Sequence, residues 1–224
     1  MADDAARIAS APAVRIRPGL PSDAAVVCGI REEAVRSSSG LWMDDVPTPE
    51  QSAAWFARQL EAGTLLVAVD EAGKADGVGG ADGSGDSDGS GESDGSGESD
   101  GSGGEDRAQG RDGAGADVLD CGAVLGYACF GPLRDYSGYR FTAEDSIYLL
   151  PAAQGRGVGR ALLTALTDLA AERGMHTLNA FIEAGNTASI RLHSVCGFTE
   201  TGRMAQAGFK FDRWWDLVIM QRML

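Results

Sequence analysis

The chain has 224 residues, of which 43% are hydrophobic and 23% charged, a composition typical of a single water-soluble folded domain. Its net charge is −14. Residues 74–120 alone contain 13 acidic and 3 basic side chains, whereas the remaining chain contains 20 acidic and 16 basic ones, so most of the negative charge belongs to that one segment. Because no apolar run approaches the roughly 18 residues that cross a bilayer, and no basic stripe is present, we expect neither a membrane nor a nucleic-acid partner.

A short alanine-rich segment, residues 1–12, precedes the first regular pattern. It carries Asp3 and Asp4 where a secretory signal carries basic residues, so we expect a disordered tail on a cytoplasmic protein. The four cysteines lack the closely spaced pairs of a zinc site, and we therefore expect reduced thiols and no metal.

From residue 13 onward, strand and helix patterns alternate. Short β-branched apolar runs predict strands, and apolar residues three or four positions apart predict helices. Ser22 or Asp23 is placed to cap the first helix, and Pro49 stands early in the second, where proline is tolerated. The predicted elements are a strand at 14–17, helices at 21–36 and 48–62, strands at 65–70, 123–130 and 145–150, a helix at 158–173, a strand at 177–182, a helix at 187–195, and strands at 198–206 and 214–223. This order indicates one α/β domain with a mixed sheet over residues 13–224.

Residues 74–120 interrupt this domain with a repeated six-residue unit that first reads Asp82-Gly-Ser-Gly-Asp-Ser. The segment has almost no apolar side chains to offset the entropy of ordering, so we expect it to be disordered. The strands on either side, 65–70 and 123–130, form a hairpin if it is removed. Because the cost of loop closure grows slowly with length, an elongated hairpin turn is tolerated. Specific calcium binding is the alternative, although the repeat matches neither an EF-hand loop nor the nine-residue β-helix unit.

The most informative stretch is 147–160, where an apolar strand leads into a glycine-rich turn and then a helix. Such a turn exposes backbone N–H groups, and the helix dipole adds partial positive charge, which together suit a phosphate. Arg156 and Arg160 can pair with phosphate oxygens. A P-loop requires Gly-Lys-Ser/Thr where Arg160-Ala161 stands, and the dinucleotide fingerprint requires a third glycine at 160. A glycine-rich turn without a ligand is the remaining structural alternative.

The spacing Gln154-x-x-Gly157-x-Gly159 is similar to the pyrophosphate-binding signature of the GNAT acetyltransferases, and 186–198 resembles the segment after the fifth strand of that family. The resemblance implies a mixed, mostly antiparallel central sheet flanked by helices, with the acidic insert in one hairpin. It also implies acetyl-CoA as co-substrate and a homodimer. The implied cofactor contacts are Ile147, Tyr148, Leu149, Gln154, Gly155, Arg156, Gly157, Val158, Gly159, Arg160 and Asn186.

Further runs, among them Leu41-Trp42, 139–144 and 208–214, look like the phosphinothricin and methionine sulfoximine N-acetyltransferases. This resemblance implies direct attack of a small amino-acid-like amine on the acetyl thioester, with Glu144 as general base. His193 stands where the GNAT family has a tyrosine, and the resemblance implies that it protonates the departing thiolate. The implied substrate contacts are Trp42, Arg134, Asp135, Tyr136, Arg140, Asp145 and Ser146.

Because the sequence departs from that family pattern at several positions, it does not identify the amine that accepts the acetyl group. The first helix carries Glu32-Glu33 where the family has uncharged or basic residues, and Asp135 and Asp212 also differ. Acetylation of a protein N-terminus or a lysine shares every cofactor motif and is one alternative. The other is a non-catalytic acetyl-CoA-binding protein whose acidic insert binds a partner or calcium. Glu144 could also serve only as an ion-pair partner of Arg140, and His193 could be a buried core histidine.

Overall fold

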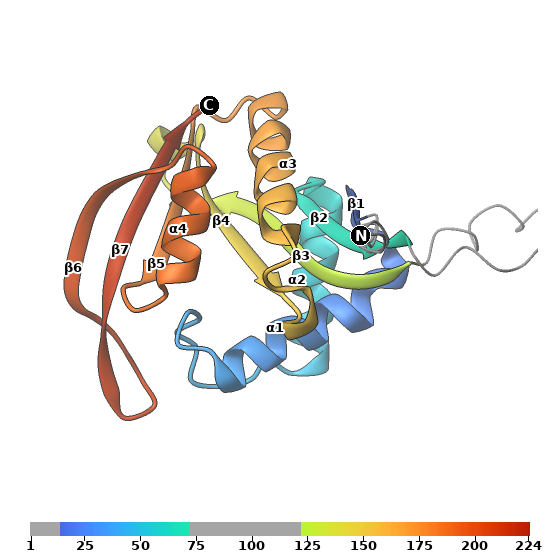
Figure 1. Ribbon diagram of the computed structural model, residues 1–224, viewed down its shortest axis with the longest axis horizontal. Coiled ribbons are helices and arrows are strands. Elements are labelled where there is room, and N and C mark those ends of the chain that lie inside the picture. Colours follow the sequence, from blue (N-terminus) through green and yellow to red (C-terminus); the bar gives the residue numbers. More distant parts are fainter. Residues whose placement is uncertain (1–13, 72–121) are drawn as a thin grey trace, which may run out of the picture. The chain divides into compact units, whose positions relative to one another are not determined.

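A seven-stranded sheet runs through the described residues, 14–71 and 122–224, of this computed structural model (Figure 1). The predicted tail and the acidic insert lie outside the described residues. The strand order is β1-β2-β3-β4-β5-β7-β6, and the β4–β5 pair is the parallel one. The strands are β1 (Val14–Pro18), β2 (Leu65–Asp70), β3 (Ala123–Pro132), β4 (Thr142–Leu149), β5 (Thr177–Glu183), β6 (Thr199–Lys210) and β7 (Arg213–Met223). The helices are α1 (Ala24–Ser37), α2 (Pro49–Ala62), α3 (Val158–Glu172) and α4 (Thr187–Val195). This is the predicted mixed, mostly antiparallel sheet flanked by helices.

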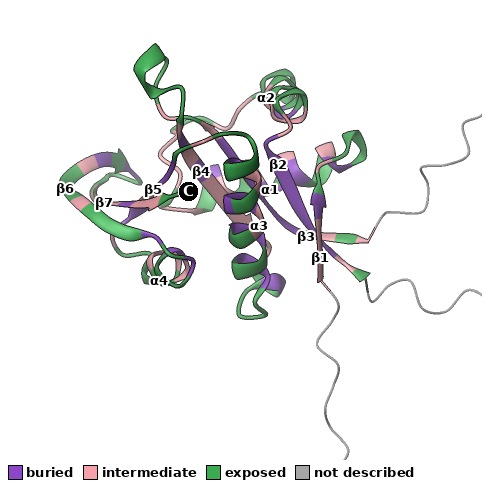
Figure 2. Ribbon diagram, turned by 90° about the horizontal axis from the view of Figure 1, so that it is seen from above, coloured by how far each residue is buried: buried purple, intermediate pink, exposed green. Residues whose placement is uncertain are grey.

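Two apolar cores lie on the two faces of the sheet. Helices α3 and α4 cover one face, with Leu162, Leu163 and Leu166 of α3 fully buried against β3, β4 and β5. Helices α1 and α2 cover the other face, where Val27 and Phe56 pack on β2 and β3. Figure 2 shows α3 and α4 on one side of the sheet and α2 on the other. Among the described helices, none is long and apolar enough to cross a membrane.

The pairing of β2 with β3 confirms the predicted hairpin across the insert. The two strands pair antiparallel from Leu65↔Cys129 to Asp70↔Ala123, so the chain leaves and re-enters the sheet at adjacent positions. Strands at 65–70 and 123–130 therefore belong together although the insert separates them in sequence.

The starts of α1 and α2 follow different rules. Helix α2 begins at Pro49, as predicted within one residue, and Thr48 caps it: the Thr48 hydroxyl accepts from the Gln51 N–H, while the Gln51 side chain accepts from the Thr48 N–H. Asp23 stands at the N-cap of α1 but makes no capping hydrogen bond. Its buried carboxylate instead takes two hydrogen bonds from the Arg17 guanidinium, at 2.7 and 2.9 Å. Asp23 thus has the predicted position at the start of α1, but its backbone is already helical and its carboxylate accepts from the Leu20 N–H, at 2.8 Å, in the preceding turn instead of from the N–H groups of α1.

The last hairpin is longer than predicted. Strand β6 runs to Lys210, four residues beyond the predicted end, and Lys210 pairs with Arg213 of β7. The two residues between them, Phe211 and Asp212, have φ values of +54° and +57°. A two-residue hairpin turn requires this left-handed backbone, which the sequence usually signals with Asn-Gly or Asp-Gly. Because neither signal is present, the turn was not recognised.

Candidate active site

Strands β4 and β5 separate after a short parallel contact. They pair from Thr142↔Thr177 to Glu144↔Asn179, and beyond this point β4 continues on β3 while β5 continues on β7. The buried Asn179 amide donates to the Ala143 carbonyl at 3.0 Å and stabilises the point of separation. The facing edges of β4 (145–149) and β5 (180–183) are therefore free to bind an extended ligand as an added strand would bind.

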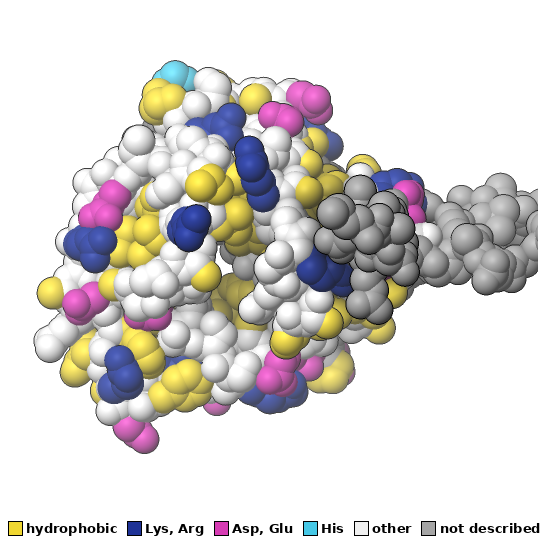
Figure 3. All heavy atoms as spheres, in the orientation of Figure 1, with side chains coloured by type: hydrophobic (Ala, Val, Ile, Leu, Met, Phe, Trp, Pro, Cys, Tyr) yellow, Lys and Arg dark blue, Asp and Glu magenta, His cyan; other side chains and the backbone are white. Residues whose placement is uncertain are grey.

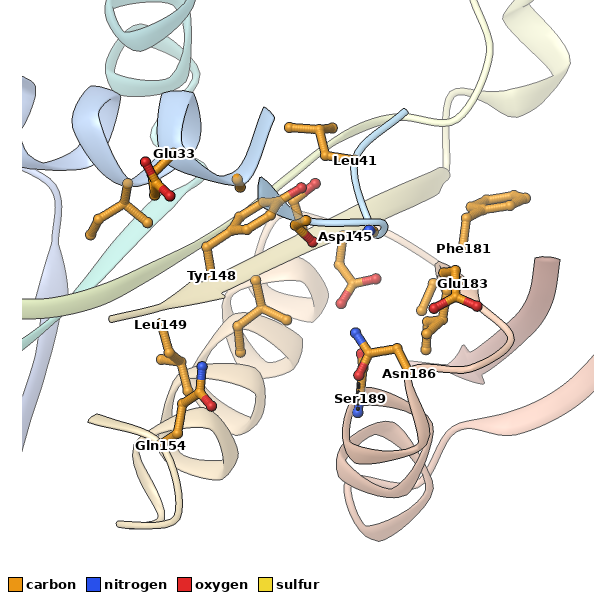
Figure 4. A pocket seen from close by; sticks show the side chains of 18 of the residues that line it. Glu33, Leu41, Asp145, Tyr148, Leu149, Gln154, Phe181, Glu183, Asn186 and Ser189 are labelled. Carbon is orange, nitrogen blue, oxygen red and sulfur yellow. Dashed lines mark hydrogen bonds between the residues drawn. The ribbon is translucent and has the colours of Figure 1, made fainter. Parts of the chain in front are cut away.

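A pocket of about 400 Å³ occupies this opening (Figure 4). It is lined by β4 and β5, by the end of α1 and the loop that follows it, and by the start of α4. The space-filling view shows a hollow at the centre of the face that carries α3 and α4 (Figure 3). The predicted site residues that line the pocket are Glu144, Asp145, Ser146, Ile147, Tyr148, Leu149, Gln154, Asn186 and His193.

The glycine-rich turn begins just after Gln154, which lines the pocket, whereas the predicted contacts at 155–160 are not part of the lining. Gly155 and Gly157 have φ values of +72° and +82°, and a Cβ at either position would meet nothing within 4 Å. Both positions therefore need left-handed backbone and leave open space beside it. Gly157 is also the N-cap of α3, and no side chain caps the helix there. The first N–H groups of α3 are thus available to an anionic ligand.

Other residues of the turn have different environments. Val158 and Gly159 are buried, and a Cβ on Gly159 would lie 3.2–3.3 Å from Leu192 and Leu149, so this glycine allows α3 to pack closely. Arg156 donates to the Asp70 carboxylate at 3.1 Å. Arg160 is exposed and borders a second hollow along α3.

Glu144 lies at the point where β4 and β5 separate. Its carboxyl is half-buried, and burial raises the pKa of Glu144, with a further increase from the charge of Asp145 and a decrease from Arg134. A raised pKa makes the carboxylate a stronger base than a free glutamate. The structure therefore places a base of increased strength in the pocket.

His193 and Asp145 form a buried pair at the back of the pocket. The His193 Nε2 lies 3.0 Å from Asp145 Oδ2, and its Nδ1 lies 2.8 Å from the Ser189 carbonyl. Because a carbonyl only accepts, Nδ1 carries a hydrogen. Burial lowers the pKa of His193, but the hydrogen bond and charge of Asp145 outweigh it, so the pKa is raised.

The two neighbouring acids on β4 face opposite sides of the sheet. Asp145, only 7% exposed, lies on the α3–α4 side beside His193, while Ser146 and Tyr148 share the α1–α2 side with Glu144. The Asp145 carboxyl thus contacts His193 and lies on the opposite side of the sheet from Glu144.

The other predicted substrate contacts lie away from the pocket lining. Arg134, Asp135, Tyr136 and Arg140 are exposed on the loop between β3 and β4, and Arg140 donates to the Ser137 carbonyl at 3.0 Å. Trp42 packs against Gly208 of β6, and its indole N–H donates to the Ser39 carbonyl. Of this group, the charge of Arg134 reaches Glu144.

Several pocket residues were missed in the sequence. Glu33 of α1, Glu183 of β5 and Leu41 of the α1–α2 loop all line the pocket. The Glu33 position was noticed only as a departure from the family pattern, and no local motif marks Glu183. Glu183 is more than 100 positions from Glu33 and Leu41, so their meeting depends on the folded sheet.

Comparisons with known proteins agree with this geometry. Residues 96–198 match the Acetyltransferase (GNAT) family. Over 209 residues, 93% of each chain, the protein is 46% identical to the L-amino acid N-acyltransferase MnaT of Escherichia coli. It is 52% identical over 103 residues to an L-methionine sulfoximine/L-methionine sulfone acetyltransferase of Salmonella typhimurium, a match that spans 46% of this chain and 60% of that relative.

The solved structures give the same result for the fold. A GNAT superfamily phosphinothricin acetyltransferase of Sinorhizobium meliloti, in complex with acetyl-CoA, superimposes with a TM-score of 0.69 at 28% identity, covering 94% of this chain and 88% of the other. The likeness to MnaT spans nearly the whole of both chains, and the opening between β4 and β5 lies beside the motif from which the family was first inferred. The chain belongs to the GNAT acetyltransferase family.

Proposed function

We propose that the protein transfers the acetyl group of acetyl-CoA to the amino group of a small amino-acid-like substrate of the phosphinothricin or methionine sulfoximine type. The observation that carries the proposal is the opening between β4 and β5, where free strand edges and Glu144 line one pocket. Gln154 also lines this pocket, and the uncapped start of α3 follows it three residues later in the chain. The relatives named for these substrates support the substrate class.

The described residues fit acetyl-CoA as co-substrate. The left-handed Gly155 and Gly157 leave room for phosphate oxygens at the start of α3, with Arg160 close by and Arg156 reachable after exchange from Asp70. The free edge of β4 can hydrogen-bond the amide groups of an extended arm. Acetyl-CoA supplies, when bound, the activated acetyl thioester.

Two acid–base groups complete the proposed mechanism. Glu144 accepts a proton from the substrate ammonium, directly or through water, so that the neutral amine can attack. His193 is the proposed proton donor to the departing thiolate, and the proton comes from Nε2 because the Nδ1–H is held by the Ser189 carbonyl. Asp145 keeps His193 protonated by raising its pKa, and the 3.0 Å contact between Nε2 and Asp145 breaks when the proton is transferred. A backbone N–H of β4 near Tyr148 or Leu149 polarises the acetyl carbonyl.

One feature of the pocket favours testing a second class of acceptor. Its lining includes the carboxyl groups of Glu33, Glu144, Asp145 and Glu183, and no lysine or arginine among the described residues. Such a lining attracts cationic amines, such as a lysine side chain or a polyamine, more than a substrate with a carboxylate. These amines therefore belong beside the amino acids in the assay.

The remaining proposals concern the domain boundaries, the cellular location and the oligomeric state. We propose a single domain over 13–224 with a tail at 1–12 and an acidic spacer at 74–120, in a cytoplasmic homodimer. Exposed apolar side chains on the last hairpin, among them Phe209 and Trp214, support a subunit interface there. Light scattering tests the dimer. Deletion of 74–120 tests the spacer, and this deletion is expected to leave kcat/KM unchanged.

The function is tested by release of free thiol from acetyl-CoA with a panel of amines. The panel holds phosphinothricin, methionine sulfoximine, methionine sulfone, the common amino acids, polyamines and short peptides. Turnover of the sulfoximine or phosphinothricin, reduced by about 10²–10⁴ in Glu144→Gln, supports the proposal. Glu172→Gln, an exposed change at the far end of α3, is the control. Turnover of peptides alone would move the assignment to a protein substrate.

A further inference from the structure

The loop between α1 and α2 forms one wall of the pocket. Ser38, Gly40 and Leu41 line it, and Leu41 faces the cavity from the side opposite Gln154 and Asn186 (Figure 4). The loop lies on the α1 side, where the carboxyl of Glu144 also points. A shift of this loop would therefore change the space beside Glu144 while leaving the start of α3 in place.

A buried lysine from a distant strand holds this loop. Lys210, at the end of β6, is 4% exposed, and its ammonium donates to the Ser38 carbonyl at 2.8 Å and the Leu41 carbonyl at 2.6 Å. These two carbonyls mark the two ends of the part of the loop that lines the pocket. The strand end that carries the lysine is itself held, because the Trp215 indole donates to the Lys210 carbonyl at 2.9 Å.

The chemistry of this contact is unusual for a buried charge. Moving an ammonium from water into a protein interior is costly, and buried lysines are normally paired with carboxylates. Here both acceptors are backbone carbonyls of one loop. Burial lowers the pKa of Lys210, and the charge of Asp44 on the same loop opposes this. A leucine or methionine would fill the space at a smaller desolvation cost, so the distinctive effect of the lysine is to hold the loop.

Two further contacts hold the same loop. The Trp42 ring packs on Gly208, two residues before Lys210, and a Cβ at that position would overlap the ring. On the inner side, the Ser39 hydroxyl donates to the Glu183 carboxylate at 3.2 Å. The loop is therefore fixed to β6 at one edge and to β5 at the other.

We infer that Lys210 is a positioning residue of the acetyl-transfer site, which holds the α1–α2 loop as the wall that shapes the binding space of the acceptor amine. The inference rests on the proposed function. It assigns Lys210 to binding of the acceptor and to neither acetyl-CoA binding nor proton transfer.

The test compares Lys210→Met with Arg203→Met, which removes a charge from an exposed position on the same strand. Steady-state kinetics are measured with the best amine of the panel and with acetyl-CoA. Lys210→Met is expected to raise KM for the amine about tenfold or more, because charged hydrogen bonds that hold the wall are lost. KM for acetyl-CoA is expected to change less than about twofold, and Arg203→Met is expected to behave as wild type.

Two more variants keep the test open if Lys210→Met does not fold. Lys210→Arg keeps a charged donor and should restore part of the amine affinity. Gly208→Ala keeps Lys210 but displaces Trp42, so it should reproduce the rise in KM for the amine. Hydrogen exchange of residues 38–44 should become faster in Gly208→Ala and Lys210→Met and stay unchanged in Arg203→Met.

The outcomes distinguish failure of the role inferred for Lys210 from failure of the proposed acetyl-transfer function. If wild type transfers acetyl groups but Lys210→Met and Gly208→Ala keep the wild-type KM for the amine, the role of Lys210 is refuted and the proposed function stands. An equal rise in KM for both substrates would also refute it, because the lysine would then act on the whole fold. If wild type acetylates no amine, the proposed function itself fails.

Discussion

Asp145 Oδ2 and His193 Nε2 lie 3.0 Å apart in a site where both side chains are almost fully buried. The residues are 48 positions apart in sequence, on β4 and α4. The pair connects the strand that carries Glu144 with the helix that Asn186 caps, so one contact joins the two proposed halves of the site.

Replacing Asp145 by asparagine should lower the pKa of His193. The carboxylate is what raises that pKa against burial, and burial remains in the variant. In wild type the folded pKa lies above 6.5, so the stability from the charged histidine is complete below pH 6.5 and is lost as pH rises through the folded value. The difference in free energy of unfolding between wild type and Asp145→Asn should therefore be largest at low pH. NMR titration of His193 measures the pKa directly, and an unchanged value would contradict this account.

Glu144 should set the acidic limb of the activity profile. The base must be ionised to accept a proton, and its pKa is raised above 4.5 by burial. kcat/KM for the amine should therefore fall as pH drops through this raised value, and Glu144→Gln should lose that limb along with most activity. Measurement of kcat/KM against pH for both proteins tests this. If the acidic limb of the pH profile persists in Glu144→Gln, a group other than Glu144 is responsible for it.

Gly157→Ala should weaken acetyl-CoA binding. The residue has φ of +82° at the start of α3, and an L side chain there is strained by about 1–2 kcal/mol. The strain should move the first N–H groups of α3 and raise KM for acetyl-CoA about tenfold, with little change for the amine. Gly174→Ala is the matched control, since its φ is +78° at the other end of the same helix. Both variants should lose similar stability, and equal KM effects would contradict the assignment.

Arg17→Met should destabilise the fold without a direct effect on the pocket. It leaves the buried Asp23 carboxylate without its two guanidinium bonds, a change that costs about 3–5 kcal/mol in comparable buried pairs. Denaturant unfolding should show this loss, while Arg203→Met, at an exposed pair, should unfold like wild type. A second change, Asp23→Leu, should recover part of the loss. A loss below about 1 kcal/mol would show that water replaces the arginine.

Most of the fold was predictable because its signals are local. The apolar periods of α3 and α4, the proline and threonine at the start of α2 and the short runs of β2 and β3 each specify their own element. The end of β6 was not predictable, because Phe211 and Asp212 adopt left-handed backbone without a glycine. That conformation is imposed by the pairing of β6 with β7 and not by the preferences of the two residues.

The sequence by itself determined the glycine-rich turn, the part of the site that we propose for acetyl-CoA. Gln154, Gly155 and Gly157 are near neighbours in the chain, and the φ freedom of glycine and the dipole of the next helix act over a few residues. Tertiary structure alone decided the proposed acceptor half, where Lys210 reaches a loop about 170 residues earlier, and the Asp145–His193 pair that links the two halves. Backbone geometry is set by neighbours in sequence, whereas a buried charge finds its partner only after the sheet has brought distant strands together.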